Sequence, residues 1–351
     1  MKYLIYCGPG IGDFLIALPM AAAIKNSDPK SFIRMITTSS RERIKLSKTL
    51  LSLQNYVDDI DYYSHVEKTH SIKMLFRNGY KIFDYGFVIQ YTANSNTSSM
   101  PSKIVRIASK ITCGLKVPDK KIIKYDYFID YKHGTNIYEY PLLMLTAVGL
   151  NYPIVRKPLL DTDKISKCLP PFIIKTQKKI ITLCVGTANV SFKINGVSID
   201  NDSKNWPYDY WVELANNLAG KGYDVILLGG KKEEIEFEVY KEKLSNKYIR
   251  IYLGCLKIEE SLAVLQISDL VVGADTGMMH CSAALAKPLL ALFGCTDYNE
   301  YLPAGEKSHY ISSNEDCSPC FGTELSVLCK NKKCMYNLKP QTIIKKIESI
   351  V

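Results

Sequence analysis

The sequence lacks an apolar run long enough to cross a bilayer. The longest uncharged apolar stretch near the N-terminus is Phe14–Ile24, well short of the roughly 20 residues that a spanning helix needs. Glycines and Asp13 interrupt the region before it, and no clean cleavage pattern follows, so it differs from a secretory signal. We therefore expect a cytoplasmic protein.

Low-complexity tracts and short repeats are also lacking, and the 24 tyrosines form no ribonucleoprotein-type motif. Nucleic acid is thus not an expected partner. The 351 residues are 47% apolar and 23% charged, which is typical of a globular chain of about two domains. Lys and Arg are spread along the chain and give a net charge of +10. That charge fits either an ordinary surface or attraction to a membrane, a phosphorylated glycan or a nucleotide.

Two common phosphate-binding motifs fail at the first glycine-rich turn. Gly8, Gly10 and Gly12 follow the apolar run Tyr3–Cys7. A dinucleotide fingerprint would need a third glycine where Asp13 stands, and no Gly-Lys-Ser/Thr follows to make a P-loop. Asp13 has two interpretations: an acidic residue favoured in a first helical turn, or a functional carboxylate in a loop at the end of a strand.

Strand-like and helical runs alternate in both halves of the chain, which favours βαβ units and parallel sheets. The proline-containing segment Pro153–Gln177 interrupts the alternation, and Lys179–Val185 restarts it as a buried strand. We predict an α/β fold with two Rossmann-like domains, residues 1–165 and 166–351, and a cleft between them.

Polar residues follow several strands of the second half. In "VVGADTGMMHCSAALAKP" we predict Asp275 at the N-cap of a helix opened by Gly277, with Thr276 beside it and His280 one turn in. Such a helix start can bind an anion, although Asp and Thr are also ordinary caps. Two further features have equally plain structural interpretations. Lys204 in "SKNWP" is also explained as a surface lysine, and the carboxylates in "LLGGKKEE" as acidic residues at a solvated helix start.

The order of these motifs resembles glycosyltransferase family 9, the bacterial heptosyltransferases. The matching stretches are "GIGDFLIALP", "KNWP", "GGKKE", "DTGMMH" and "KPLLALFGCTD". The resemblance covers nearly the whole chain and implies a GT-B fold. It also implies a nucleotide-sugar donor, such as ADP-heptose, on the C-terminal domain and the acceptor on the N-terminal domain.

The resemblance further implies a role for each matching residue. Asp13 would be the general base of an inverting transfer, in a loop on the acceptor side with Gly10 and Gly12. Lys204 and the helix start at Thr276 and Gly277 would stabilise the leaving diphosphate, so no catalytic metal is expected. The other donor-binding residues would be Thr187, Glu233 or its neighbour Glu234, Asp275 and His280.

One segment departs from the family pattern. Residues 188–203, "ANVSFKINGVSIDNDS", are longer than the usual loop, and Ile194-Asn195-Gly196-Val197 favours a hairpin turn. Because of this insertion, the sequence does not determine which phosphate contacts Thr187 makes or how the acceptor reaches the site.

Four of the eleven cysteines gather near the C-terminus: Cys317, Cys320, Cys329 and Cys334. Their C-x2-C and C-x4-C pairs favour one structural zinc or iron ion that orders residues 315–336. Reduced, unliganded thiols are the alternative, and disulfides are disfavoured in a reducing compartment.

The leading hypothesis is an inverting glycosyltransferase that moves a heptose to a bacterial surface glycan, lipid-linked or free. The acceptor could equally be a protein of the autotransporter type. The +10 charge admits peripheral contact with the anionic inner membrane. The remaining alternatives are a non-catalytic sugar-nucleotide-binding relative and a nucleotide-dependent epimerase or dehydrogenase; the failed fingerprint argues against the dehydrogenase.

Overall fold

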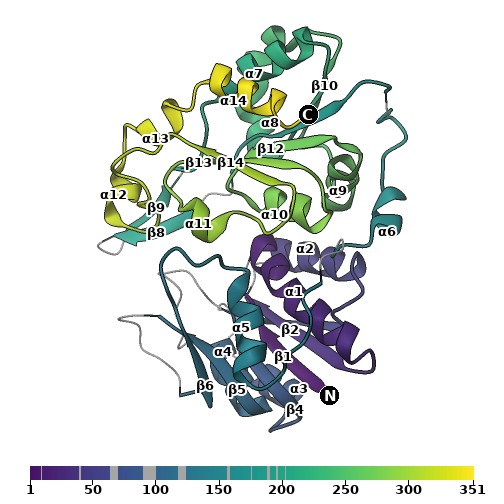
Figure 1. Ribbon diagram of the computed structural model, residues 1–351, viewed down its shortest axis with the longest axis vertical. Helices are drawn as coiled ribbons and strands as arrows, with labels where there is room; N and C mark the ends of the chain where they lie inside the picture. Colours follow the sequence, from purple (N-terminus) through teal and green to yellow (C-terminus); the bar gives the residue numbers. More distant parts are fainter. Residues whose placement is uncertain are drawn as a thin grey trace. The chain divides into compact units, whose positions relative to one another are not determined.

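The computed structural model divides into two compact units, Met1–Asp161 and Thr162–Val351, and each is described here by itself (Figure 1). The division falls near the expected 165/166 boundary. The described residues are 1–8, 10–38, 41–63, 70–89, 100–117, 124–155, 159–174, 176–187, 190–194, 197–201 and 203–351.

The first unit is built on a six-stranded parallel sheet of order β3-β2-β1-β4-β5-β6. Its strands are β1 (Lys2–Tyr6), β2 (Phe32–Thr38), β3 (Asp59–Tyr63), β4 (Phe83–Val88), β5 (Ser109–Lys116) and β6 (Tyr127–Asp130). β1 is buried from Tyr3 onward because it lies in the middle of the sheet, as expected for a parallel sheet with both faces covered.

Helices cover the two faces of this first sheet: α1 (Ile11–Ser27), α2 (Arg41–Ser52), α3 (His70–Asn78), α4 (Met100–Ala108) and α5 (Glu139–Ala147). Leu4 and Tyr6 of β1 pack into a core with Met74 of α3 and Ile104 of α4. α1 is buried from Phe14 to Ile24 except at Pro19, which explains why its sequence is apolar all round.

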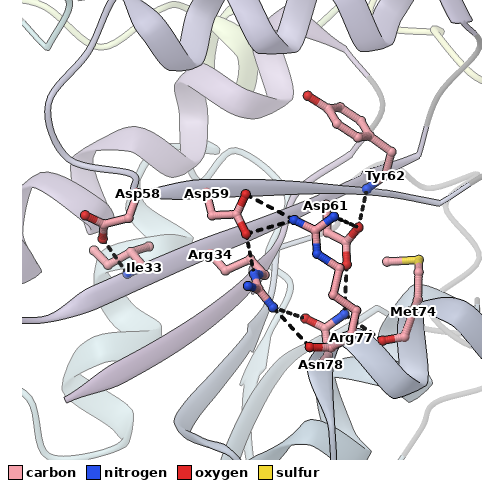
Figure 2. A network of polar contacts seen from close by, with 9 residues as sticks. All are labelled: Ile33, Arg34, Asp58, Asp59, Asp61, Tyr62, Met74, Arg77 and Asn78. Carbon is pink, nitrogen blue, oxygen red and sulfur yellow. Dashed lines mark hydrogen bonds and ion pairs between the residues drawn. The ribbon is translucent and has the colours of Figure 1, made fainter.

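A charged network ties β2 and β3 to the end of α3 (Figure 2). Arg34 and Arg77 both bind the Asp59 carboxylate, at 2.8 and 3.0 Å. Asp61, which is 4% exposed, accepts a hydrogen bond from the Asn78 amide at 2.9 Å. Each acidic group is therefore paired, as buried charges must be, and we assign this network to the stability of the unit.

The second unit repeats the same topology. Its six-stranded parallel sheet has the order β11-β10-β7-β12-β13-β14. The strands are β7 (Ile180–Cys184), β10 (Asp224–Gly229), β11 (Ile249–Leu253), β12 (Leu270–Ala274), β13 (Leu289–Phe293) and β14 (Ser308–Ser312). In both units the strand order is that of a Rossmann fold. The predicted α/β class is confirmed.

The helical segments of the second unit are α6 (Thr162–Ser166), α7 (Tyr208–Gly220), α8 (Lys231–Phe237), the 3-10 helix η1 (Glu238–Leu244), α9 (Ile258–Ile267), α10 (Gly277–Ala284), α11 (Tyr298–Tyr301), α12 (Glu324–Leu328), α13 (Lys333–Tyr336) and α14 (Pro340–Glu348). Trp211 of α7 and Ile343 of α14 share a core with Ile181 and Leu183 of β7. Val264 of α9 packs with Ile180 in a separate cluster. β7 thus carries apolar side chains toward both of its faces.

The inserted segment contains the predicted hairpin strands. β8 (Val190–Ile194) and β9 (Val197–Asn201) pair antiparallel, while the turn at Asn195-Gly196 lies outside the described residues. β9 contacts α12, and the hairpin lies beside the cysteine-bearing segment in yellow (Figure 1). The insertion and the cysteine segment therefore meet at one side of the second sheet.

No helix within the described part of the chain is both long enough and apolar enough to cross a membrane.

Candidate functional site

The residues singled out by sequence lie at the carboxyl ends of central strands. In each unit the strand order reverses at the first strand, β1 or β7, and ligands of open α/β sheets bind at this switch point. Asp13 follows β1, Thr187 follows β7, and Asp275 follows β12, the neighbour of β7. Each unit thus has its polar loop where this fold class places ligands.

In the first unit Asp13 closes the turn after β1. Gly10 is the N-cap of α1 and Asp13 is the third helical residue; the Gly10 N–H donates to Asp13 Oδ2 at 2.7 Å. A Cβ built on Gly8 would lie 2.5 Å from Asp13 Oδ1, so only glycine fits there. Gly12 lies in the same first turn. The carboxylate is therefore held in one orientation by its own loop.

In the second unit Lys204 and Asp275 form an ion pair. Lys204 Nζ lies 2.7 Å from Asp275 Oδ2, and the two side chains are 19% and 6% exposed. Burial by itself would raise the pKa of the Asp275 carboxyl, but the Lys204 ammonium opposes it and the pKa falls below its usual range. The lysine is thus neither a surface lysine nor an isolated charge: a buried carboxylate partly balances it.

His280 is a buried, neutral neighbour of this pair. Burial lowers the pKa of its imidazole to about 4; the Asp275 carboxylate opposes that shift and the Lys204 ammonium adds to it. His280 therefore carries no charge at neutral pH. It can contribute a hydrogen bond or packing to the site, but no positive field.

The N-cap of α10 differs from prediction by one residue. Thr276, not Asp275, is the N-cap, and its side chain does not cap the helix. The prediction of Asp275 as N-cap was wrong: Thr276 is the extended residue directly before Gly277, and the Asp275 carboxylate pairs with Lys204. The buried Thr276 hydroxyl has no hydrogen-bond partner among the described residues. Gly277 opens the helix as predicted. A hydroxyl and the first backbone N–H groups of a helix thus lie beside a lysine.

Glu233 closes the turn after β10 much as Asp13 closes the turn after β1. Gly230 is the N-cap of α8, and its N–H donates to Glu233 Oε2 at 2.9 Å. A Cβ on Gly186, whose φ is +85°, would lie 2.2 Å from Glu233 Oε1. Glu233 is only 6% exposed, whereas Glu234 is more open and pairs with Lys231. Thr187, next to Gly186, donates a hydrogen bond to the Asn205 side chain.

The cysteine segment packs onto the second unit rather than standing apart from it. Cys334 and Met335 are buried in the main core cluster. Burial raises the pKa of the Cys320 thiol to about 12, with further contributions from Cys295, Cys334, Cys317 and Cys329. The five sulfurs therefore share one neighbourhood. Even so, no group of three or more His, Cys, Asp or Glu side chains is placed to hold a metal ion in the part of the chain that the structure describes.

Sequence reasoning missed two residues beside Lys204. The Phe321 ring centroid lies 4.1 Å from Lys204 Nζ, and the Cys295 thiol lies 3.2 Å from the hydroxyl of Ser203. Phe321 stands inside the cysteine motif "CSPCFG" and Cys295 inside "LFGCTD". No local pattern could pair them with Lys204, because the contacts join segments far apart in the chain.

The sequence comparison matches the C-terminal unit to one family profile. Residues 176–331, which hold Thr187, Lys204, Glu233, Asp275 and His280, match the profile described as Glycosyltransferase family 9 (heptosyltransferase). The match covers less than half of the chain and lies within its C-terminal unit. The family resemblance expected from the motifs is confirmed.

Curated heptosyltransferases and solved heptosyltransferase structures are also similar to this chain. Lipooligosaccharide heptosyltransferase 2 of Campylobacter jejuni is 27% identical over 186 residues, 52% of this chain and 54% of that protein. The chain spans about half the length of the curated relatives it matches. The structure of E. coli heptosyltransferase WaaC with ADP aligns over 100% of both chains with TM-score 0.72 and 17% identity.

A second solved structure shares the fold. It is described as the bacterial iron-containing dodecameric glycosyltransferase TibC from enterotoxigenic E. coli, and it covers 99% of this chain and 75% of its own, with TM-score 0.54 and 11% identity. Both structural matches show a shared fold, and the expected GT-B class is confirmed.

Proposed function

We propose that this protein is an inverting glycosyltransferase that transfers a sugar, heptose from ADP-heptose, to a hydroxyl of a bacterial surface glycan. One observation carries the proposal. At the switch point of the unit that matches the family 9 profile, the Lys204 ammonium lies beside the loop that leads into α10, and the Thr276 hydroxyl of that loop has no hydrogen-bond partner in the described part of the chain. That combination suits the diphosphate of a nucleotide-sugar.

In this proposal the second unit binds the donor and stabilises the leaving group. As the bond between the anomeric carbon and the diphosphate oxygen breaks, the electron pair stays on the diphosphate, and negative charge grows there. Lys204 and the N–H groups at the start of α10 stabilise that charge. Asp275 holds Lys204 from the side, so the ammonium is already oriented. In this scheme a lysine and a helix terminus do the work for which other transferases use a divalent metal.

In this proposal the first unit supplies the general base, Asp13, which takes the proton of the attacking hydroxyl. The acceptor oxygen attacks the anomeric carbon from the face opposite to the diphosphate, and its proton passes to the Asp13 carboxylate. The Gly10 N–H orients that carboxylate, and Gly8, which has no Cβ, leaves room for it. A fixed base loses no orientation freedom on the way to the transition state.

Three further residues of the second unit would complete the donor pocket: Glu233, Thr187 and His280. Glu233 would bind the ribose.

Two features support the choice of substrates. The relatives are named lipooligosaccharide or lipopolysaccharide heptosyltransferases, and solved structures of the same fold were determined with ADP or with a fluorinated ADP-heptose. We therefore propose a surface-glycan acceptor and a cytoplasmic site of action. A protein acceptor is the second candidate, favoured by the four-cysteine segment.

We also propose that Cys317, Cys320, Cys329 and Cys334 bind one structural zinc or iron ion. The thiols share a neighbourhood, and four thiolates suit either metal. Since no three of these groups are in ligand positions in the described chain, metal loading requires the short segments around α12 and α13 to draw together. A site with four protein ligands is closed and takes no part in transfer.

Peripheral contact with an anionic membrane is the last part of the proposal. Exposed apolar and cationic side chains lie on α3, on α4 and on the turn before β4 of the first unit. We call this the amino-edge patch: Phe76, Tyr80, Ile82, Ile107, Lys73, Lys81, Lys103 and Arg106. Phe76 and Tyr80 are 85% and 73% exposed, and the Lys81 N–H bonds the Ile107 carbonyl. Aromatic groups ringed by cations suit an anionic lipid interface.

The experiment for the central proposal is a transfer assay with ADP-heptose and an extracted acceptor glycan. Product bearing one added heptose of inverted anomeric configuration supports it. Nucleotide-sugar binding without release of ADP would instead indicate a non-catalytic relative.

A further inference from the structure

The cysteine-bearing segment reaches the donor site through one aromatic ring. Lys204 Nζ lies 4.1 Å from the centre of the Phe321 ring and 2.7 Å from Asp275 Oδ2. A cation within about 6 Å of an aromatic face is attracted to it. The ammonium therefore has a carboxylate and a ring as partners, and 19% of the lysine side chain stays exposed to receive a ligand.

Backbone hydrogen bonds fix the position of Phe321. The N–H groups of Cys320 and Phe321 both donate to the Cys295 carbonyl at 2.8 Å. The Ser318 hydroxyl donates to the Gly294 carbonyl at 2.7 Å. Gly294 and Cys295 directly follow β13, so the segment is tied to the carboxyl edge of the sheet, where the donor loops lie.

The same anchor reaches the chain just before Lys204. The Ser203 hydroxyl and the Cys295 thiol are 3.2 Å apart, and both residues are buried. Cys295 thus contacts the cysteine segment through its carbonyl and the lysine loop through its sulfur. Phe321 and Lys204, distant in sequence, are set relative to each other through one residue.

We propose that Phe321 is a positioning residue for Lys204, and that through it the cysteine-bearing segment sets the affinity for the nucleotide-sugar. A free lysine side chain loses rotamer entropy when it binds an anion. A lysine already held between Asp275 and the Phe321 ring has lost much of that freedom before the donor arrives. The inference rests on the proposed role of Lys204 at the diphosphate.

The test separates positioning from packing. Phe321→Leu keeps apolar volume but removes the ring face, whereas Phe321→Tyr keeps the ring. We expect Phe321→Leu to raise the donor KM about 2- to 30-fold, the range that a cation–π contact is worth, and to lower kcat as well, because the displaced Lys204 also stabilises the leaving diphosphate. Phe321→Tyr should restore the wild-type KM. Leu325→Ala, at an exposed position of the same segment, is the matched control and should have no effect.

A double-mutant cycle closes the argument. If Phe321 acts through Lys204, the variant Lys204→Met/Phe321→Leu should bind donor no more weakly than Lys204→Met alone. Fully additive losses, or an unchanged KM in Phe321→Leu while Lys204→Met weakens binding, would overturn the inference and leave the proposed function standing. Unchanged donor binding in Lys204→Met would remove Lys204 from the site, and the proposed donor role with it.

Discussion

Acidification should destabilise the second unit through His280. This imidazole lies buried on α10, near Asp275 and Lys204, and burial lowers its pKa to about 4 from an ordinary value of 6.5. The folded protein therefore resists a proton that the unfolded chain accepts. Where the unfolded state binds more protons, stability falls as the pH falls. The window runs from about pH 6.5 down to about pH 4.

The size of the effect follows from the two pKa values. A difference of about 2.5 units corresponds to about 3 kcal/mol once the pH is below both values, since each unit is about 1.4 kcal/mol. Between about pH 7 and about pH 5 the expected loss is about 2 kcal/mol. That is a measurable part of the stability of an ordinary domain, about 5–15 kcal/mol.

Urea unfolding at the two pH values measures this loss, and His280→Gln should remove it because glutamine does not titrate. His309→Gln, on β14, is the matched control and should leave the loss in place. The chain has only five histidines, so NMR can follow each imidazole directly. Lys204→Met should raise the pKa of His280, because the lysine helps to lower it. A wild-type His280 that titrates near 6.5, or a His280→Gln variant with the same pH dependence, would refute the reasoning.

Three further outcomes are expected. Lys204→Ala should weaken ADP-heptose binding by about 1.5–3 kcal/mol, the value of a charge-assisted contact, as measured by calorimetry, while Lys221→Ala, whose partner is Glu348, should not; equal affinities would exclude Lys204 from the site. Elemental analysis of protein purified without chelator should find one zinc or iron per chain, and four freely titratable thiols in metal-free native protein would end the metal proposal. The protein should co-sediment with vesicles that contain anionic lipid, and the double variant Phe76→Ser/Tyr80→Ser should abolish this co-sedimentation. Co-sedimentation that these changes leave unaffected would exclude the amino-edge patch as the membrane-binding surface.

Sequence was most informative where a strand is buried and its loop is short. Lys179–Val185 was predicted as a buried strand, and β7 (Ile180–Cys184) lies within it, because a short continuous apolar run that ends at Gly186 favours a buried strand. The edge strands β6 and β14 were not predicted. Their residues are mostly exposed or half-buried, so they lack the apolar run that marks central strands.

The candidate site was predictable in its parts but not in its pairings. Asp13 and Asp275 could be found because each follows a strand at a glycine-containing turn. That Asp275 turns to Lys204, and that Phe321 covers the same ammonium, depends on tertiary contacts. The cysteine segment was expected to order only around a metal. Instead Cys334 and Met335 are buried in the core of the second unit. The spacing of the four cysteines alone did not indicate that the segment packs into this core.

The most direct test of the central claim is the transfer rate of Asp13→Asn. Asparagine keeps an oxygen for the Gly10 N–H bond but cannot take the acceptor proton. We expect transfer to fall by about 10²–10⁴, with donor affinity within a few fold of wild type and an unchanged melting temperature. Glu260→Gln is the matched control, because Glu260 makes the same capping contact with the Lys257 N–H on α9, and it should transfer normally. Wild-type transfer by Asp13→Asn would contradict the account.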